Sequence, residues 1–266
     1  MGILNVTPDS FFDGGNYCSI DTALYRVEQM LAEGASLIDI GGESTRPDAQ
    51  VISLEEELQR VIPVIEAIAA RFDTWLSIDT YKPEVMAQAA VSGVHLINDI
   101  MALQIPGALE VAAASNLPIC LMHRRSQPGM MERRPHYHQL LFEMIAFFQE
   151  RMTACQAAGI AKARLLLDPG FGFDKTVEHN YQILGNLKQL HTLSRPLLIG
   201  LSRKSMIRYA LADLKDPGAS GSVAAAVIAV MQGVRIVRVH DVRETVEALR
   251  IASRVLDGNF GSLIHD

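Results

Sequence analysis

Cysteine is scarce in this sequence, and so are the segments that mark a secreted or membrane protein. Its three cysteines, Cys18, Cys120 and Cys155, are odd in number and widely spaced, which supports neither a disulfide framework nor a zinc site. No apolar run is long enough to cross a bilayer, and no basic segment leads into an apolar one, so we expect no membrane partner and no secretory signal. Reduced thiols are the simplest interpretation, and they predict a cytoplasmic location.

Positive charge and aromatic residues are also in short supply. A net charge of −6 argues against nucleic acid as a partner, because nucleic acid usually requires a basic surface. Arginines do gather at Arg124, Arg125, Arg133 and Arg134, but proline and other residues interrupt them, and a solvated loop is the simpler interpretation. With 49% hydrophobic, 20% charged and only 6% aromatic residues, the chain is expected to be globular with a large core.

The sequence does contain a regular alternation of short apolar runs and amphipathic segments. Most of the apolar runs do not alternate in polarity, which is typical of strands buried on both faces of a parallel sheet. Strands are predicted over residues 2–6, 36–41, 74–79, 95–99, 118–123, 164–168, 196–202 and 235–240. Helices are predicted over 21–34, 53–72, 82–93, 138–159, 177–190, 222–233 and 241–255, where capping residues such as Ser53 and Gly93 flank the periodic segments.

This alternation predicts an α/β protein with a single (β/α)8 TIM barrel. A doubly wound sheet is the alternative, but the number of strands and the lack of a second domain favour the barrel. No linker or low-complexity segment divides the chain, so residues 1–266 are expected to form one domain.

Polar residues follow every predicted strand. The carboxyl ends of barrel strands meet at one rim, where active sites form. The residues expected at this rim include Asn5, the segment GGESTRP, Asp79, Asn98, His123, Asp168, the segment SRKS, Arg238 and His240. Helix caps and turns explain one or two such residues but not a whole rim, so a functional site is predicted there.

Asp79, Asn98 and Asp168 are the candidates for recognising a ligand inside this rim. Buried carboxylates and amides must be satisfied. A metal cluster is one solution, although a hard cation such as Mg²⁺ prefers water and phosphate to a complete protein cage. The other solution is a flat heterocycle with adjacent N–H donors, such as the edge of a pterin, because a carboxylate accepts two N–H groups at once.

Cationic residues form the other side of the predicted rim. Lys204, Arg238 and His240, together with Asn5, are expected to hold a diphosphate, with Mg²⁺ as the accompanying ion. A salt bridge within the rim, for example between Arg238 and Asp241, is the alternative.

Several long motifs of the chain resemble dihydropteroate synthases of folate biosynthesis. They are MGILNVTPDSFFDGG, IDIGGESTRP, SIDTYKPEV, INDI, LLLDPGFGF, HNYQIL, GLSRKS and VRVHD, spread from Met1 to about Ala252. The resemblance implies a transferase reaction. The diphosphate of (7,8-dihydropterin-6-yl)methyl diphosphate leaves first as pyrophosphate, and the amine of 4-aminobenzoate then attacks the methylene to give 7,8-dihydropteroate.

The resemblance also implies roles for individual residues. The pterin would be bound by Asp79, Asn98, Met122, Asp168, Lys204 and Arg238. The aminobenzoate would be bound by Phe11, Thr45, Arg46, Pro47, Phe173 and Ser205. The pyrophosphate would be bound by Asn5, Arg238 and His240, with Asn5 as the ligand of Mg²⁺. Catalysis would depend on Asp13, Asp79, Asp168, Lys204 and Arg238, with residues 7–16 and 43–50 closing over the site.

Some positions depart from the family pattern. Phe12 stands where a small polar residue is usual and Asp48 where a small one is usual, and both changes bear on loop closure and on sulfonamide sensitivity. Asp174 stands where glycine is common, and if it faces the site it weakens the attraction of anions near the rim. The segment MHRRSQPGMM also differs from the usual MHMQGTPRTM.

Two other functions are compatible with parts of this pattern. A pterin-binding methyltransferase on the same barrel would share Asp79, Asn98 and Asp168 but should lack STRP and SRKS, which are both present. A non-catalytic pterin-binding homologue would tolerate the loss of Asn5 or Lys204, which are both retained. Residues 222–233 are apolar over most of their surface, and the family is dimeric through its later helices, so a homodimer is predicted.

Overall fold

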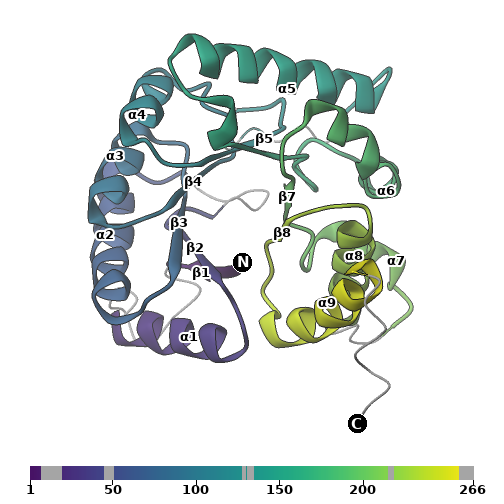
Figure 1. Cartoon of the computed structure of the whole chain (residues 1–266), viewed down its shortest axis with the longest axis horizontal. Coiled ribbons are helices and arrows are strands. Elements are labelled where there is room, and N and C mark those ends of the chain that lie inside the picture. The colour runs from purple at the N-terminus through teal and green to yellow at the C-terminus, as the bar shows by residue number, and fades with distance from the viewer. Residues whose placement is uncertain (7–19, 45–50, 128–129, 131–134, 215–218, 258–266) are drawn as a thin grey trace.

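The computed structural model describes residues 1–6, 20–44, 51–127, 130, 135–214 and 219–257 (Figure 1). Five of the predicted site residues, Phe11, Asp13, Thr45, Arg46 and Pro47, lie outside these ranges, as do the departures Phe12 and Asp48.

Parallel strands form the centre of the described chain, and each is short. The strands are β1 (Gly2–Asn5), β2 (Leu37–Gly41), β3 (Trp75–Asp79), β4 (Leu96–Asp99), β5 (Ile119–Met122), β6 (Leu165–Asp168), β7 (Leu198–Ile199) and β8 (Ile236–Val237). Strands β1 to β6 pair in sequence order in one parallel sheet, and β7 pairs with β8 in a second.

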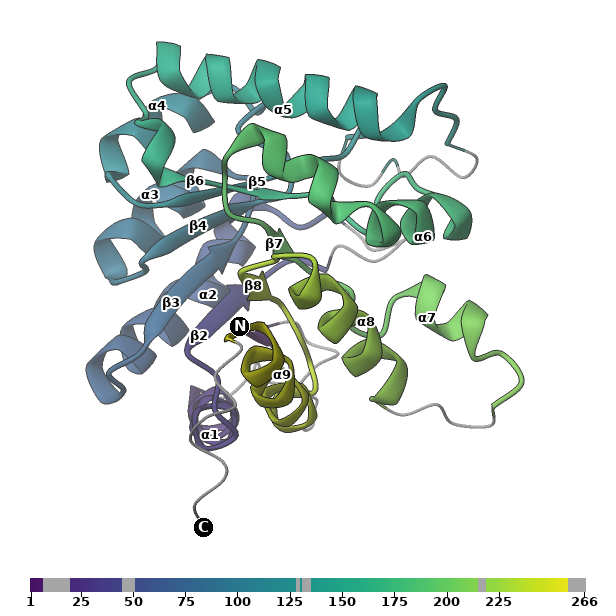
Figure 2. The ribbon, with the colours of Figure 1, turned by 45° about the vertical axis from the view of Figure 1, so that its right-hand side comes forward.

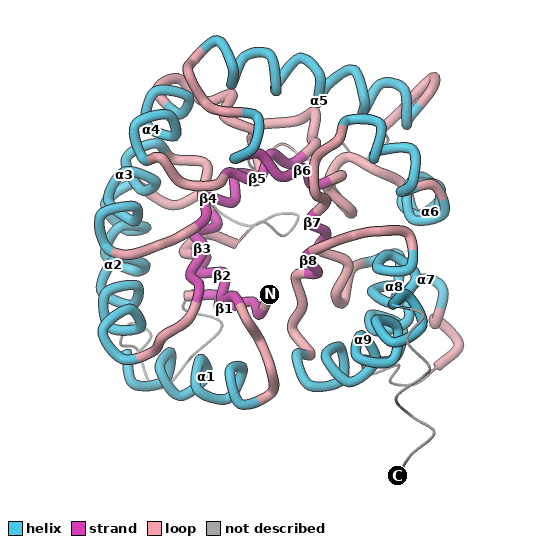
Figure 3. Tube along the Cα trace, viewed as in Figure 1, coloured by secondary structure: helices cyan, strands magenta, loops and turns pink. Residues whose placement is uncertain are grey.

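Parallel bridges connect the two sheets on both sides. Leu167 of β6 pairs with Leu197, next to β7, and Gly2 of β1 pairs with Val239, beyond β8. The backbone N–H of Ile3 donates to the carbonyl of Val239 over 3.0 Å. Together these contacts take the strands around a ring, as Figure 3 shows, and they confirm the predicted (β/α)8 barrel.

Helices surround this ring (Figures 1 and 3). They are α1 (Ile20–Ala32), α2 (Leu54–Arg71), α3 (Pro83–Ser92), α4 (Ala108–Ser115), α5 (Leu140–Ala157), α6 (Val177–Gly185), α7 (Ser205–Ala210), α8 (Ser220–Met231) and α9 (Val242–Asp257). Two 3-10 segments, η2 (Lys162–Arg164) and η3 (Leu187–Leu193), precede β6 and β7. The main core lies between the helices and the strands, where side chains such as Ile38, Ile78 and Phe148 have no exposed surface.

The sequence misses two helices of the described chain. None of the predicted ranges falls between β4 and β5, where the structure has α4. This helix is only eight residues long, too short for a convincing apolar period, and residues in the left-handed conformation, Gly107 and Asn116, flank it at both ends. The segment after SRKS also forms a separate short helix, α7, before α8 begins.

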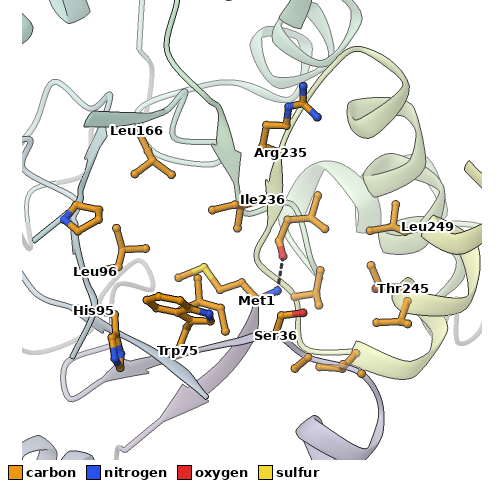
Figure 4. A pocket seen from close by; sticks show the side chains of 18 residues that line it. Met1, Ser36, Trp75, His95, Leu96, Leu166, Arg235, Ile236, Thr245 and Leu249 are labelled. Atoms are coloured by element: carbon orange, nitrogen blue, oxygen red, sulfur yellow. Dashed lines mark hydrogen bonds between the residues drawn. The ribbon is translucent and has the colours of Figure 1, made fainter. Parts of the chain in front are cut away.

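A cavity of about 540 Å³ lies at the amino ends of the strands, opposite the polar rim (Figure 4). Its walls include Trp75, His95, Leu96, Leu166 and Ile236, which stand at or near the first residue of their strands. The amino group of Met1 donates to the carbonyl of Val237 over 3.1 Å beside this cavity, and burial lowers the pKa of that amino group to about 6. Because the wall is largely apolar and lacks the predicted site residues, this cavity is not the candidate site.

Among the residues that the structure describes, no helix combines the length and the apolar character needed to cross a membrane.

Candidate active site

The register of the sheet brings polar residues from successive strands to one level. Asn5 of β1 is opposite Gly41 of β2, Gly41 is opposite Asp79 of β3, and Asp79 is opposite Asn98 of β4. Gly41 has no side chain, and a Cβ there would come within 3.6 Å of Asp79 and 3.9 Å of the Asn5 amide oxygen. The glycine therefore leaves space between two of the predicted ligand-binding residues, which fits the shared rim that the sequence predicts.

Arg238, just after β8, is the cation at the centre of this level. Its Nε donates to Asp39 Oδ2, and its Nη2 donates to Asp79 Oδ2 over 2.7 Å. Asn98 Nδ2 also donates to Asp39 Oδ2, over 3.2 Å. One guanidinium thus joins residues of β2, β3 and the segment after β8, and fixes the orientation of both carboxylates.

The predicted alternative, a salt bridge within the rim, is present, but the partners of Arg238 are Asp39 and Asp79, and Asp241 is the wrong example. Asp241 pairs with Arg203, whose Nε donates to Asp241 Oδ2 over 3.1 Å. Arg203 is largely exposed, with 61% of its side-chain surface accessible, so this ion pair lies on the outside of the rim.

Asp39 is a site residue that the motifs in the sequence did not assign. It lies in the middle of β2, has no exposed surface, and contacts both Arg238 and Asn98. Its Oδ1 atom is buried and has no hydrogen-bond partner among the described residues. The signal in the sequence is a single carboxylate within the apolar run LIDIG, because such a charge is buried only where a partner compensates it.

The segment LLLDPGFGF forms the opposite side of the site. Asp168 ends β6, and its Oδ1 accepts a hydrogen bond from the backbone N–H of Gly170 over 2.7 Å. Gly172 has a positive φ of 80°, and a Cβ at this position would lie 3.2 Å from the Cδ of Lys204. The two glycines therefore let the chain turn sharply after the carboxylate and let a lysine approach the backbone closely.

Lys204 extends from the loop before α7 into this turn. Its Nζ donates to the carbonyl of Phe171 and lies 4.7 Å from the centre of the Phe173 ring. Phe173 packs with Met122, which stands opposite Asp168 in the pairing of β5 with β6. The structure thus brings Lys204, Met122, Asp168 and Phe173 close together, and the roles that their motifs suggest stay predictions.

Burial shifts the ionisation of three groups at the site. Desolvation raises the pKa of Asp79 to about 7, although Arg238 opposes this shift. Desolvation also raises the pKa of Asp168, against the attraction of Lys204. The pKa of Lys204 is lowered to about 8 by burial, which outweighs the effect of Asp168. The pKa of Arg238 shifts the other way: burial alone would lower it, but Asp39 and Asp79 raise it, so this side chain stays charged.

The remaining described candidates lie at the rim with different partners. His240 Nδ1 is 2.9 Å from Ser202 Oγ, which places the ring beside the loop after β7. Ser205 is the first residue of α7 and is exposed. Asp99, next to Asn98, accepts hydrogen bonds from the backbone N–H groups of Met101 and Leu103, so its carboxylate stabilises a turn instead of facing the site.

Comparisons with known proteins find relatives that match this chain over most of its length. A family model described as pterin binding enzyme matches residues 1–240. A dihydropteroate synthase of Escherichia coli (strain K12) is 54% identical over 256 residues, which are 96% of this chain and 91% of the relative. One of Haemophilus influenzae is 52% identical over 251 residues, which are 94% of this chain and 91% of the relative.

Solved structures give the same result. The chain superposes with a TM-score of 0.91 and 56% identity on a Yersinia pestis dihydropteroate synthase in complex with a sulfonamide drug, covering 96% of this chain and 93% of that one. With a TM-score of 0.89 and 46% identity, it also superposes on a Xanthomonas albilineans dihydropteroate synthase with 4-aminobenzoic acid, covering 96% of this chain and 92% of that one.

Proposed function

The chain belongs to the pterin-binding enzyme family and catalyses the dihydropteroate synthase reaction, and we propose which residues bind each substrate and which support catalysis. The enzyme condenses (7,8-dihydropterin-6-yl)methyl diphosphate with 4-aminobenzoate, giving 7,8-dihydropteroate and pyrophosphate. The observation that best supports the division of roles is the arrangement of the rim. Buried carboxylates and an amide from β2, β3, β4 and β6 face a pair of cations, Lys204 and Arg238.

The pterin is proposed to bind among Asp79, Asn98 and Asp168. The ring presents adjacent N–H groups, which suit a carboxylate because it accepts two hydrogen bonds at once. Asp168 keeps acceptor capacity for the ligand, since Oδ1 accepts from Gly170 and a carboxylate has further lone pairs. Asp39 is proposed as an additional member of this set, because its buried Oδ1 has no protein partner in the described part of the chain. Met122 lines the pocket from β5.

The diphosphate is proposed to leave toward Asn5, Arg238 and His240. Among the described residues, no group of three or more His, Cys, Asp or Glu side chains is placed to hold a metal alone. This suits an Mg²⁺ ion that is bound mainly by phosphate and water, with the amide oxygen of Asn5 as the proposed protein ligand. When bound, Mg²⁺ would neutralise charge that develops on the departing diphosphate. Arg238 would contribute a fixed positive charge on the same side.

Once the diphosphate has left, the pterin methylene carries positive charge. Asp79, Asp168 and Asp39 are proposed to stabilise it, because carboxylates fixed in place before the reaction need no reorganisation. The charge is delocalised over the ring, so carboxylates at the ring edge stabilise it even though they do not touch the methylene. This favours the dissociative order, in which the bond to the diphosphate breaks before the amine attacks.

The aminobenzoate is proposed to bind between Phe173 and Lys204 on one side and Ser205 on the other. Ser205 begins a helix whose first N–H groups are unpaired within the helix, and its hydroxyl adds a donor for the carboxylate. Phe11, Thr45, Arg46 and Pro47 are proposed to complete this pocket, with Asp13 aiding catalysis, as their motifs suggest.

Activity is expected to follow a bell-shaped pH profile. Asp79 must be ionised to accept hydrogen bonds, and burial raises its pKa to about 7, so kcat/KM should fall as the pH drops below that value. Lys204 must stay protonated, and burial lowers its pKa to about 8, so kcat/KM should fall again as the pH rises above it.

The measurement is kcat/KM against pH for the wild type and for Lys204→Arg. Arginine keeps its charge, so the alkaline decline should disappear in the variant even though its activity is lower. A wild-type profile without either decline would contradict the assignment of both groups.

Product analysis tests the proposed function directly. The chain is mixed with the pterin diphosphate and Mg²⁺, with and without the aminobenzoate, and pyrophosphate and dihydropteroate are measured. We expect dihydropteroate to form in step with pyrophosphate when the aminobenzoate is present, and Lys204→Ala to slow both products together. Tight pterin binding without either product would instead indicate a non-catalytic homologue.

A homodimer is proposed through α8 and α9. These helices lie side by side on the outside of the barrel (Figure 2). They expose large apolar side chains, with Ile228 at 48%, Ile251 at 70% and Val255 at 52% exposure. Exposed apolar patches of this kind often mark a protein interface. Sedimentation at micromolar concentration should give the mass of a dimer, and a monomeric mass would rule the proposal out.

The cytoplasm is the proposed location of this enzyme. Cys120 and Cys155 are both buried and unpaired, which fits a reducing compartment. Small molecules are its proposed partners, and neither nucleic acid nor a membrane is proposed.

A further inference from the structure

Two charged residues beside the proposed aminobenzoate pocket have no role in the proposed reaction. Arg124 is the second residue after β5, and Asp174 follows Phe173 in the loop after β6. Both are almost fully buried, with 5% and 1% exposure. Burial lowers the pKa of Arg124, and the carboxylate of Asp174 is the strongest of the groups that oppose this shift. The Asp174 carboxylate therefore offsets part of the cost of burying the positive charge of Arg124.

Asp174 holds the loop that carries Arg124. Its Oδ2 accepts hydrogen bonds from the backbone N–H groups of Arg125, over 3.0 Å, and Ser126, over 2.9 Å. Its Oδ1 accepts a hydrogen bond from the Ser126 hydroxyl over 2.6 Å. The expectation that this carboxylate weakens the attraction of anions requires it to face the ligand, but it faces the backbone of the neighbouring loop.

Arg124 connects this loop to Phe173. Its Nη2 donates to the carbonyl of Gln127 over 3.0 Å and to Ser126 Oγ over 3.3 Å, which keeps the guanidinium within the loop. The guanidinium carbon lies 5.4 Å from the centre of the Phe173 ring. Lys204 Nζ lies 4.7 Å from the same ring, so two cations contact the aromatic side chain that lines the proposed pocket.

We propose that Arg124 is a positioning residue for the aminobenzoate, that it fixes the ring of Phe173, and that Asp174 acts through it by holding the loop in place. The inference rests on the proposed function, because it assigns the neighbourhood of Phe173 to the aminobenzoate. It adds to the site a pair of residues from the loops after β5 and β6. The ring position is thus set from two directions, by Lys204 on the α7 side and by Arg124 on the β5 side.

A double-mutant cycle tests this proposal. The variants are Arg124→Met, Asp174→Gly and the combination, with kcat and the KM of each substrate measured for all of them. Methionine keeps an unbranched side chain without charge, and glycine is unstrained at the positive φ of 47° that Asp174 adopts. Each single change is expected to raise the KM for the aminobenzoate about fivefold, the factor typical of a lost cation–π contact, while kcat and the KM for the pterin diphosphate change little.

The double variant shows whether Asp174 acts through Arg124 or whether the two residues affect the aminobenzoate KM independently. Because Asp174 acts through Arg124, the double variant should have the same aminobenzoate KM as Asp174→Gly alone. Arg124→Lys should be intermediate, since it keeps the charge but cannot keep both loop contacts. A double variant whose KM is the product of the two single effects, or single variants with unchanged KM, would overturn the proposal.

Arg125→Met is the matched control. Arg125 is in the same loop, but its Nη1 donates to the carbonyl of His136 over 2.6 Å, and its guanidinium stacks 4.9 Å from the Tyr137 ring, away from Phe173. The aminobenzoate KM of this variant should be that of the wild type, and an equal rise would indicate a general loop effect and contradict the proposal. If the wild type forms no dihydropteroate, the proposed function is wrong, independently of the roles of Arg124 and Asp174. The same variants are then compared by their aminobenzoate Kd, measured by calorimetry.

Discussion

Replacing Arg238 with methionine is expected to lower kcat/KM by about a thousandfold, at the upper end of what the loss of one fixed donor to a developing charge produces. The guanidinium bridges Asp39 and Asp79 and is proposed to stabilise the departing diphosphate. Its loss removes the positive charge from the anion side and leaves two buried carboxylates facing each other. The Asp79 carboxyl, whose pKa is already raised, would then bind a proton more readily and accept hydrogen bonds from the pterin less well.

The same change should also reduce stability. Removing one partner of a buried ion pair leaves an uncompensated charge and commonly costs about 3–5 kcal/mol. Unfolding in urea should therefore show a lower midpoint for Arg238→Met. Raising the pH should destabilise the variant further, because the pKa of Asp79 is already raised and its ionised form loses the cation that stabilised it.

Arg203→Met provides the comparison on the same rim. Arg203 pairs with Asp241, but its side chain is 61% exposed, and exposed pairs contribute little to stability. We expect near wild-type stability and at most a few-fold change in kcat/KM. If Arg203→Met lost as much stability and kcat/KM as Arg238→Met, the loss of any arginine at the rim would explain both results. The specific contacts of Arg238 with Asp39 and Asp79 would then not be the cause.

Asp168→Asn is expected to weaken pterin binding about a hundredfold while the protein remains as stable as the wild type or becomes more stable. A hydrogen bond to a charged group contributes about 1.5–3 kcal/mol, and an amide offers one acceptor and one donor where the carboxylate offers only acceptors. The new N–H₂ group would oppose an N–H of the ring. Calorimetry with the pterin diphosphate or a pterin analogue measures the change in Kd.

The sign of the stability effect follows from the raised pKa of Asp168. A carboxyl group whose pKa is higher in the folded than in the unfolded protein favours folding when protonated, so its ionisation at neutral pH opposes folding. Asparagine has no charge to bury, and its amide oxygen can still accept the hydrogen bond from Gly170. The thermal midpoint at pH 7 should therefore not fall.

Asp99→Asn makes the same chemical change at a carboxylate with a structural role. Asp99 accepts two backbone N–H groups in the turn after β4, both over 2.7 Å, and asparagine can replace only one of these contacts well. Burial raises the pKa of Asp99 to about 6, as it raises that of Asp168, but in this variant a buried backbone N–H also loses its acceptor. The thermal midpoint should therefore fall, and the pterin Kd should change only slightly. Wild-type pterin affinity in Asp168→Asn would remove Asp168 from the proposed pterin site.

Much of this arrangement is predictable from the sequence because it depends on strand ends. A polar residue directly after a buried apolar run can only lie at the carboxyl end of a strand, and parallel strands bring those ends together. Asp79, Asn98 and Asp168 are found this way. Asp39 is not, because it lies within a strand, and its partner Arg238 is 199 residues away along the chain. Only the closed ring shows that the two meet.

The Arg124–Asp174 unit shows a second limit. Both residues stand out in the sequence, one in a group of arginines that suggests a solvated loop and the other as a charge where glycine is common. Their burial depends on how the loops after β5 and β6 pack together, and no local pattern encodes that contact. The interpretation of Arg124 as solvated is wrong for this physical reason.

Closure of the ring also has a consequence for synthesis of the protein on the ribosome. Residues 1–3 form backbone hydrogen bonds with Val239, so β1 cannot pair along this edge until residue 239 has been translated. Asp39 and Asp79 are already made at that stage, but Arg238 is not. Until then the two carboxylates lack the cation that pairs with them in the folded protein, and the diphosphate side of the site cannot be complete. We expect partly synthesised chains to depend on chaperones until that strand pairs.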